Sequence, residues 1–299
     1  MRTTNKMQKI FRGAGVALIT PFDSDLQVDF ESLGKLVDSQ IENSMDFLVV
    51  LGTTAETATL SQNEKQSLID FVTKRTARKI PVMVGVGGNS TAEVIEQLHS
   101  LDLSKADGIL SVVPYYNKPS QQGIYMHFMA IAAACPMPIM LYNVPGRTGV
   151  SMTAETTLRL AHDAENIIGT KEASGNFGEI IKILKGKPEK FSVITGDDSL
   201  VVPTISLGGE GVISVAANLA PAMIASMTHY ALSGDYRNAA SIQLDIQSLV
   251  EDLFAEGNPS GVKAAMNTTG TTGNYVRLPL VPVSDNLYSQ IAEKTKKLF

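Results

Sequence analysis

The amino-acid sequence predicts an α/β protein in which eight parallel strands, each followed by a helix, close into a (β/α)8 TIM barrel with a C-terminal helical extension. Short apolar runs rich in Val and Ile recur eight times within the first 215 residues. Segments of helical character fill the gaps between them at a roughly even stride. An open, doubly wound sheet shows the same alternation, but eight strands at an even stride favour the barrel.

The strands are expected where the apolar runs are continuous. Such runs, in contrast to alternating apolar and polar residues, are typical of parallel strands covered on both faces. The eight predicted strands are GVALIT (15–20), FLVVLGT (47–53), IPVMVGVG (80–87), ADGILSVV (106–113), PIMLYNV (138–144), NIIGTK (166–171), FSVITG (191–196) and GEGVISV (209–215).

The helices are predicted from capping signals and from apolar residues at helical spacing. The tetrapeptides SQNE (61–64) and STAE (90–93) match the capping box, so helices should begin there. Apolar residues between 68 and 72 keep the i, i+3, i+4 spacing of one buried stripe. Segments 155–164 and 178–186 have the same character.

The chain continues well beyond the eighth predicted strand, further than one closing helix requires. The remainder contains helical runs such as PAMIASMTHYALSG and YRNAASIQLDIQSLVEDLFAEG. We therefore predict a catalytic barrel over residues 1–233 and a C-terminal α-helical domain over residues 234–299.

Composition argues against several classes of protein. Hydrophobic residues make up 44 % of the chain and the net charge is −5, so the chain is globular and has no basic patch for nucleic acid. No apolar run approaches the roughly 20 residues of a membrane helix, and the N-terminus lacks the apolar core of a secretory signal. The single cysteine, Cys135, lies in an alanine-rich stretch. We expect an unreactive thiol in a cytoplasmic protein.

The strand ends define the candidate chemistry, because active sites of this fold lie at the carboxyl ends of the strands. These ends offer one lysine, one arginine, several hydroxyl groups and glycines that permit close backbone approach. In chain order the end segments are Thr20–Phe22, Gly52–Glu56, Pro114–Asn117, Tyr142–Arg147, Lys171–Glu172, Gly196–Asp198 and Ile213–Ser214.

Metal and phosphate binding find little support at these ends. Asp197 and Asp198 offer two carboxylates for Mg²⁺, but adjacent carboxylates on a turn more often cap the following helix. The glycines at 85–88 lack the third glycine of a dinucleotide fingerprint, and no basic residue follows Gly208–Gly209. All four histidines fall within predicted helices without ligand spacing: His99, His127, His162 and His229.

Lys171 ends the buried run NIIGTK, and lysine is almost never fully buried without a partner or a task. A structural interpretation makes it a solvated loop residue or an ion-pair partner of Glu172. A catalytic interpretation follows from desolvation, which penalises the ammonium form and favours a neutral amine that attacks carbonyl carbon. The iminium so formed is an electron sink for a carbanion at the adjacent carbon. An inward lysine among hydroxyl groups therefore suits Schiff-base chemistry.

Five segments at the strand ends resemble the dihydrodipicolinate synthase family, which belongs to the pyruvate-dependent class I aldolases together with N-acetylneuraminate lyase. The resemblance runs from Gly13 to the C-terminal helices. It implies a condensation of pyruvate with L-aspartate 4-semialdehyde, the first committed step of diaminopimelate and lysine biosynthesis, with no metal and no cofactor beyond the covalent Schiff base. The five segments are GTTAET (52–57), PYYNKPSQQG (114–123), LYNVPGRTG (141–149), GTKEASGN (169–176) and GVISV (211–215).

The resemblance implies four catalytic residues. Lys171 would form the Schiff base with pyruvate, and Tyr142 would lie over the imine and move its protons. Thr53 would hydrogen-bond Tyr142, and Tyr116 would complete the relay from a neighbouring subunit. Tyr115 and Tyr116 point to opposite sides of an extended backbone, so one can reach across an interface. The shared tyrosine implies at least a dimer, and the family implies a homotetramer of two dimers.

The resemblance also implies four substrate-binding residues. Thr54 would bind the pyruvate carboxylate, and Gly196 and the carbonyl of Ile213 would line the site. Arg147 would clamp the carboxylate of the semialdehyde, for which a bidentate guanidinium is better suited than lysine. Aldolases of polyhydroxylated sugar acids are not expected to carry this Arg-Thr-Gly sequence, so Arg147 favours the synthase.

The chain departs from the family pattern at two places. The family usually has glycine at Ala55, and if that position needs a positive φ, alanine costs about 1 kcal/mol. Lysine-inhibited members bind the effector at a dimer interface, where Lys65 here replaces a histidine of some sensitive enzymes. A cation beside a cationic ligand is unfavourable, so we expect weak or absent feedback by L-lysine. The possible effector positions are Thr57, Ala58, Gln62, Lys65, Asn89, Glu93 and Tyr115.

Three alternatives remain open. The first is another pyruvate-dependent class I aldolase, of the 2-keto-3-deoxy sugar acid or N-acetylneuraminate lyase type. The second is a metal-dependent aldolase, which EDTA inhibits and borohydride does not. The third is a barrel that only binds a small keto acid. In each case the expected partners are small molecules, with no nucleic acid and no membrane.

Overall fold

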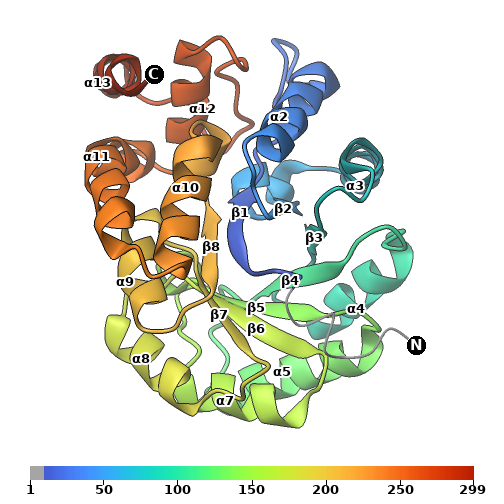
Figure 1. Ribbon diagram of the computed structural model, residues 1–299. Coiled ribbons are helices and arrows are strands. Elements are labelled where there is room, and N and C mark those ends of the chain that lie inside the picture. The colour runs from blue at the N-terminus through green and yellow to red at the C-terminus, as the bar shows by residue number, and fades with distance from the viewer. Residues whose placement is uncertain (1–9) are drawn as a thin grey trace.

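A closed barrel of eight parallel strands forms the centre of the molecule (Figure 1), and the computed structural model describes residues 10–299. The strands follow one another around the barrel in chain order, so β8 pairs with β1. The predicted TIM barrel is confirmed, and each predicted run overlaps one strand. The strands are β1 (Gly13–Ala17), β2 (Phe47–Val50), β3 (Val82–Gly85), β4 (Gly108–Val112), β5 (Ile139–Asn143), β6 (Ile167–Glu172), β7 (Ser192–Thr195) and β8 (Gly211–Ser214).

Helices cover the outside of the barrel (Figure 1). The capping box predicted at Ser61 is complete, whereas at Ser90 the hydroxyl accepts only the hydrogen bond from the Glu93 backbone. The helices after the strands are α2 (Phe30–Glu42), α3 (Gln62–Thr76), α4 (Thr91–Ser100), α5 (Gln121–Ala134), α6 (Pro145–Thr148), α7 (Ala154–Asp163), α8 (Phe177–Gly186), α9 (Val201–Ser206) and α10 (Pro221–Leu232). Short 3₁₀ turns are η1 (Thr53–Ala55), η2 (Thr57–Thr59), η3 (Asp198–Leu200) and η4 (Ala216–Asn218).

The chain after the barrel is helical, as predicted. Helices α11 (Tyr236–Ala255), α12 (Ser260–Thr268) and α13 (Asp285–Leu298) gather beside α10 on one side of the barrel (Figure 1). Buried residues of α11 and α12 belong to the same apolar cluster as the layer between the strands and their helices. The extension therefore shares the core of the barrel. Among residues 10–299, no helix has both the length and the hydropathy that a membrane crossing requires.

The inside of the barrel is filled by a second apolar cluster. Inward-facing side chains of several strands meet there, among them Phe47, Met83, Met140, Tyr142 and Ile213. A packed interior of this kind leaves the chemistry to the carboxyl ends of the strands.

A β-bulge in β6 decides which of its residues face the interior. Ile139 pairs with Ile167 but Met140 pairs with Gly169, so Ile168 is an extra residue in the ladder. After the bulge Tyr142 pairs with Lys171. Because side chains alternate along a strand, this one-residue shift places Lys171 on the face that also carries Tyr142.

Candidate active site

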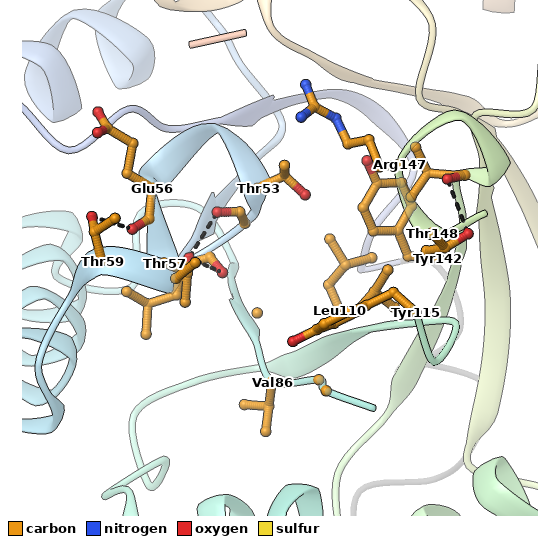
Figure 2. A pocket seen from close by; sticks show the side chains of 18 of the residues that line it. Thr53, Glu56, Thr57, Thr59, Val86, Leu110, Tyr115, Tyr142, Arg147 and Thr148 are labelled. Carbon is orange, nitrogen blue, oxygen red and sulfur yellow. Dashed lines mark hydrogen bonds between the residues drawn. The ribbon is translucent and has the colours of Figure 1, made fainter. Parts of the chain in front are cut away.

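A cavity of about 600 Å³ opens at the carboxyl ends of β2 to β5 (Figure 2). Its lining comes from the ends of these strands and the segments that follow them, from α3 and α4, and from two segments of the C-terminal extension. Thr53, Tyr142 and Arg147 all contribute side chains to it. The cavity thus lies where the fold predicts an active site.

Lys171 is buried directly beside this cavity. Only 5 % of the residue is exposed, and its Nζ lies 4.4 Å from the centroid of the Tyr142 ring. Among residues 10–299 it makes no ion pair. The neighbouring Glu172 turns to the other face of β6, where it accepts hydrogen bonds from Asn143 and from the backbone of Ser174. The interpretation of Lys171 as the ion-pair partner of Glu172 is therefore wrong.

Gly196 makes room for the lysine stem. It follows β7, and a Cβ at this position would lie 2.6 Å from Cε of Lys171 and 2.8 Å from Cβ of Ala173. Any larger residue would meet the side chain of Lys171. The predicted contribution of Gly196 to the site thus corresponds to close packing against the amine-bearing side chain.

Two threonines of η1 have different surroundings. Thr53 is exposed and lines the cavity, whereas Thr54 is buried and its Oγ1 accepts a hydrogen bond of 3.0 Å from Nδ2 of Asn258. Among residues 10–299 no hydrogen bond joins Thr53 to Tyr142, so their part in a proton relay stays a prediction. Ile213 of β8 is fully buried in the interior cluster that includes Tyr142.

The two adjacent tyrosines occupy different environments, although the backbone at Tyr116 is left-handed and not extended as the sequence analysis assumed. Tyr115 is 41 % exposed and lines the cavity (Figure 2), whereas Tyr116 is 87 % exposed and has a φ of 72°. Because so exposed a ring packs against little of its own chain, it is available to another surface. Its place in a neighbouring active site stays a prediction.

Arg147 lies on α6 and lines the cavity (Figure 2). Its Nη2 donates a hydrogen bond of 3.2 Å to the main-chain oxygen of Asn258. A guanidinium carries five donors, so this bond leaves others for an anionic ligand. The site can therefore combine an amine, a phenol, hydroxyl groups and a carboxylate-binding group.

Ala55 does not have the strained backbone that the sequence analysis considered. Ala55 belongs to η1 and is absent from the positive-φ residues, whereas its neighbour Glu56 has a φ of 55°. The positive φ thus occurs at Glu56, one residue after the position where the family usually has glycine. The expected cost of alanine therefore does not arise.

Glu56 anchors the same turn and was missed from the sequence. Its buried carboxylate lies 2.5 Å from Nζ of Lys263 and accepts a hydrogen bond from the backbone of Arg277. Burial lowers the pKa of Lys263 to about 8, although Glu56 opposes that shift. The sequence did contain a signal for a buried ion pair, because Lys263 is a lone lysine within the apolar helix sequence GVKAAM.

Most of the possible effector positions line the same cavity. These are Thr57, Ala58, Lys65, Asn89, Glu93 and Tyr115. Gln62 lines a smaller neighbouring cavity of about 250 Å³ together with Glu93. Within one chain, most of the predicted effector positions thus line the same cavity as the candidate active-site residues.

The remaining polar candidates have structural surroundings. Asp197 caps η3, which confirms the capping interpretation for this residue. Asp198 does not cap the following helix but accepts hydrogen bonds from the backbone of Val215 and Ala216, beyond β8. Burial lowers the pKa of His127 to about 4, and Cys135 is a buried free thiol. Within residues 10–299, no three His, Cys, Asp or Glu side chains converge into a group that could hold a metal ion.

Comparison with known families decides the relationship of this chain. The model of the Dihydrodipicolinate synthetase family matches residues 10–298. The chain belongs to this family.

Similar proteins of the family cover nearly the whole chain. The 4-hydroxy-tetrahydrodipicolinate synthase of Parabacteroides distasonis is 52 % identical over 287 residues, which are 96 % of this chain and 97 % of that protein. The enzyme of the same name from Phocaeicola vulgatus is 52 % identical over 276 residues, 92 % of this chain and 93 % of that protein.

Solved structures agree with this assignment. The dihydrodipicolinate synthase of Aquifex aeolicus matches with a TM-score of 0.93 at 42 % identity, over 96 % of this chain and 98 % of that one. The enzyme from Thermotoga maritima matches with a TM-score of 0.94 at 37 % identity and the same coverage. The barrel and its C-terminal extension are therefore the fold of the Dihydrodipicolinate synthetase family.

Proposed function

We propose that this chain is a 4-hydroxy-tetrahydrodipicolinate synthase, which condenses pyruvate with L-aspartate 4-semialdehyde through a Schiff base on Lys171. The observation that carries the proposal is a buried lysine, without an ion-pair partner among the described residues, in register with Tyr142 beside the cavity. The names of relatives that match 96 % of the chain support the same activity.

The amine of Lys171, in its neutral form, attacks the ketone carbon of pyruvate, and water leaves to give an iminium. A proton then leaves the methyl group, and the iminium accepts the electron pair to become an enamine. The enamine carbon attacks the aldehyde carbon of the second substrate and forms the new carbon–carbon bond. Finally the amino group of that substrate attacks the former ketone carbon, which closes the ring and releases Lys171.

Tyr142 is the proposed carrier of protons in this sequence of steps. Its ring lies against the Lys171 amine and also lines the cavity from which substrates arrive. A phenol moves protons slowly at neutral pH unless hydroxyl neighbours pass them on. Thr53 on the cavity wall, and Tyr116 of a neighbouring subunit, are the proposed neighbours.

The two carboxylates of the substrates have separate proposed sites. The pyruvate carboxylate binds the hydroxyl of Thr54, with Gly196 and the carbonyl of Ile213 completing that side. The carboxylate of the semialdehyde binds the guanidinium of Arg147, which lines the cavity. No cofactor takes part, because the covalent Schiff base itself supplies the electron sink.

The proposed assembly is a homotetramer of two dimers, since the relay needs Tyr116 from a partner. Mixing inactive Lys171→Ala and Tyr116→Phe proteins tests this sharing, because a mixed dimer then regains one intact site. A cytoplasmic location is also proposed, as the buried free Cys135 needs no oxidising compartment.

Borohydride reduction in the presence of pyruvate tests the chemistry. We expect a reduced pyruvate adduct on the peptide that holds Lys171 and no adduct in Lys171→Ala. Lys187 is the matched control, because it is 14 % exposed and donates to the carbonyl of Phe191 at the amino end of β7. Lys187→Ala should keep the adduct, and an adduct that survives in Lys171→Ala contradicts the proposal.

Arg147→Ala separates the synthase from a sugar-acid aldolase. Loss of a charge-assisted hydrogen bond should raise the KM for the semialdehyde by about 10- to 100-fold. Formation of the pyruvate adduct should stay unchanged. Retro-aldol turnover of a 2-keto-3-deoxy sugar acid at an undiminished rate in this variant favours the alternative enzyme.

A further inference from the structure

Asn258 lies on the cavity wall although it belongs to none of the five segments at the strand ends. It precedes α12 in the C-terminal extension, 204 residues along the chain from Thr54. The residue is only 6 % exposed. A polar side chain so deeply buried next to a cavity requires a reason for being there.

Its contacts join both proposed carboxylate sites. The side-chain Nδ2 donates to Oγ1 of Thr54 at 3.0 Å, and the main-chain oxygen accepts from Nη2 of Arg147 at 3.2 Å. Thr54 follows β2 and Arg147 follows β5, so these two groups come from different sides of the barrel mouth. Asn258 thus bridges the groups proposed to hold pyruvate and the semialdehyde.

The direction of the contact with Thr54 has a chemical consequence. An amide nitrogen can only donate, so the Thr54 oxygen must accept from it. The proton of the hydroxyl then remains available for another acceptor, and a carboxylate is an acceptor only. The amide of Asn258 therefore prepares Thr54 as a donor to a carboxylate.

The other atom of the amide supports a role beyond stability. Oδ1 of Asn258 is buried and has no hydrogen-bond partner among the described residues. An unsatisfied buried acceptor lowers the stability of the folded state, and a well-packed apolar side chain would avoid that cost. The amide is therefore better explained by what its nitrogen does to Thr54.

We propose that Asn258 is a positioning residue that sets the two carboxylate sites, by orienting the Thr54 hydroxyl toward pyruvate and anchoring the Arg147 guanidinium. The inference rests on the proposed function, because it takes a keto acid as the ligand of Thr54. It adds the C-terminal extension to the determinants of substrate binding.

Steady-state kinetics of Asn258→Ala and Asn258→Asp test the inference. Asn258→Ala should raise the KM for pyruvate about 10-fold while kcat changes less than about 3-fold. Asn258→Asp should raise the KM for pyruvate about 100-fold. Its carboxylate would accept the hydrogen bond that the Thr54 hydroxyl otherwise donates to pyruvate, and it would repel the pyruvate carboxylate. If Asn258 were only structural, replacing it would lower the melting temperature, but the KM for pyruvate would not rise more in Asn258→Asp than in Asn258→Ala.

A double-mutant cycle with Thr54→Ala shows whether Asn258 acts through Thr54. If it does, adding Asn258→Ala to Thr54→Ala should leave the KM for pyruvate within about 2-fold of the single Thr54 variant. Asn166→Ala is the matched control, since its Nδ2 donates to the carbonyls of Ala132 and Cys135 at the amino end of β6. It should lose stability with an unchanged KM.

An unchanged KM for pyruvate in folded Asn258→Asp overturns the inference, as do independent effects in the cycle. Asn258→Asp keeps the volume of the side chain, so the test does not depend on the alanine variant folding. The borohydride adduct on Lys171 of the unmodified protein separates the two proposals. Without that adduct the proposed function fails, whereas with the adduct and an unchanged KM only the role of Asn258 fails.

Discussion

Replacing Gly196 by alanine probes the confinement of Lys171 most directly. The added Cβ would lie 2.6 Å from Cε and 3.1 Å from Cγ of Lys171, and 2.8 Å from Cβ of Ala173. Non-bonded carbon atoms prefer separations of about 3.5–4.0 Å. The lysine stem must therefore move by about 1 Å, because Ala173 on the other side belongs to the backbone turn after β6 and cannot yield freely.

The effect on catalysis should exceed the effect on stability. Overpacking of this kind costs about 1–3 kcal/mol, so Gly196→Ala should still fold. A displacement of about 1 Å at a reacting group costs roughly 100-fold in rate. We expect the pyruvate adduct on Lys171 to form about 100 times more slowly, with a moderately lowered melting temperature.

The assay is a single-turnover measurement of the borohydride-trapped adduct, together with a thermal melt. Gly146→Ala is the matched control, because an added Cβ there meets nothing within 4 Å although the residue adjoins Arg147. This control should form the adduct at the normal rate. If folded Gly196→Ala also forms it at the normal rate, Lys171 is not held as described and the Schiff-base geometry is wrong.

Three further predictions concern the surroundings of the site. Lys263→Met should lower the free energy of unfolding by about 3–5 kcal/mol in urea titrations, because it leaves the buried carboxylate of Glu56 unpaired, and adding Glu56→Gln should restore part of the loss. Hydrogen bonds from Arg277 lower the pKa of Glu64 to about 2, so this carboxylate contributes stability above its ordinary pKa of 4.5 that is lost as the pH falls toward 2. Arg277→Ala should therefore lower the free energy of unfolding by about 1–2 kcal/mol at neutral pH, a value that allows for solvent screening. It should also flatten the dependence of that free energy on pH between 4.5 and 2. L-lysine should inhibit turnover only at millimolar concentrations, because Lys65 places a cation on the cavity wall, and Lys65→His should increase the sensitivity.

Each of these predictions has a contradicting outcome. Wild-type stability of Lys263→Met would show that Glu56 finds another partner. If the free energy of unfolding falls equally steeply at acid pH with and without Arg277, other carboxylates cause that loss of stability. Micromolar inhibition by L-lysine would show that Lys65 turns away from the bound effector.

The fold was predictable because its signals are local. Continuous apolar runs mark strands covered on both faces, and each of the eight runs overlaps a strand of the barrel. The predicted limits are less accurate, as the run 80–87 shows, since β3 covers only Val82–Gly85. Pro81 cannot donate to the ladder, and the residues after Gly85 belong to the cavity wall.

The orientation of Lys171 was not predictable in the same way. Alternation along an unbroken β6 would place Ile168 and Thr170 on one face and Lys171 on the other. The bulge at Ile168 changes that phase, and Lys171 then faces the interior with Tyr142. A bulge depends on pairing with β5 and leaves no mark in the sequence of β6 alone.

Contacts across the whole chain explain what else was missed. Glu56 and Lys263 are 207 residues apart, and Thr54 and Asn258 are 204 residues apart. Of these four residues only Lys263 is polar within an apolar run of the sequence, and for all four only tertiary packing selects the partner. The C-terminal extension was predicted as a helical appendage, and its role in holding η1 was not.

Two buried lysines illustrate how structure assigns different tasks to the same signal. Lys171 and Lys263 both interrupt apolar runs, and both are buried. Lys263 has a carboxylate at 2.5 Å and a carbonyl at 2.8 Å, so its ammonium is compensated and its position is fixed. Lys171 has an aromatic ring beside it and, among residues 10–299, no anion to hold its charge. Lys171 lacks an ion-pair partner among residues 10–299, adjoins the cavity and is packed against Gly196, so of the two lysines it is the one free to form a bond to a ketone.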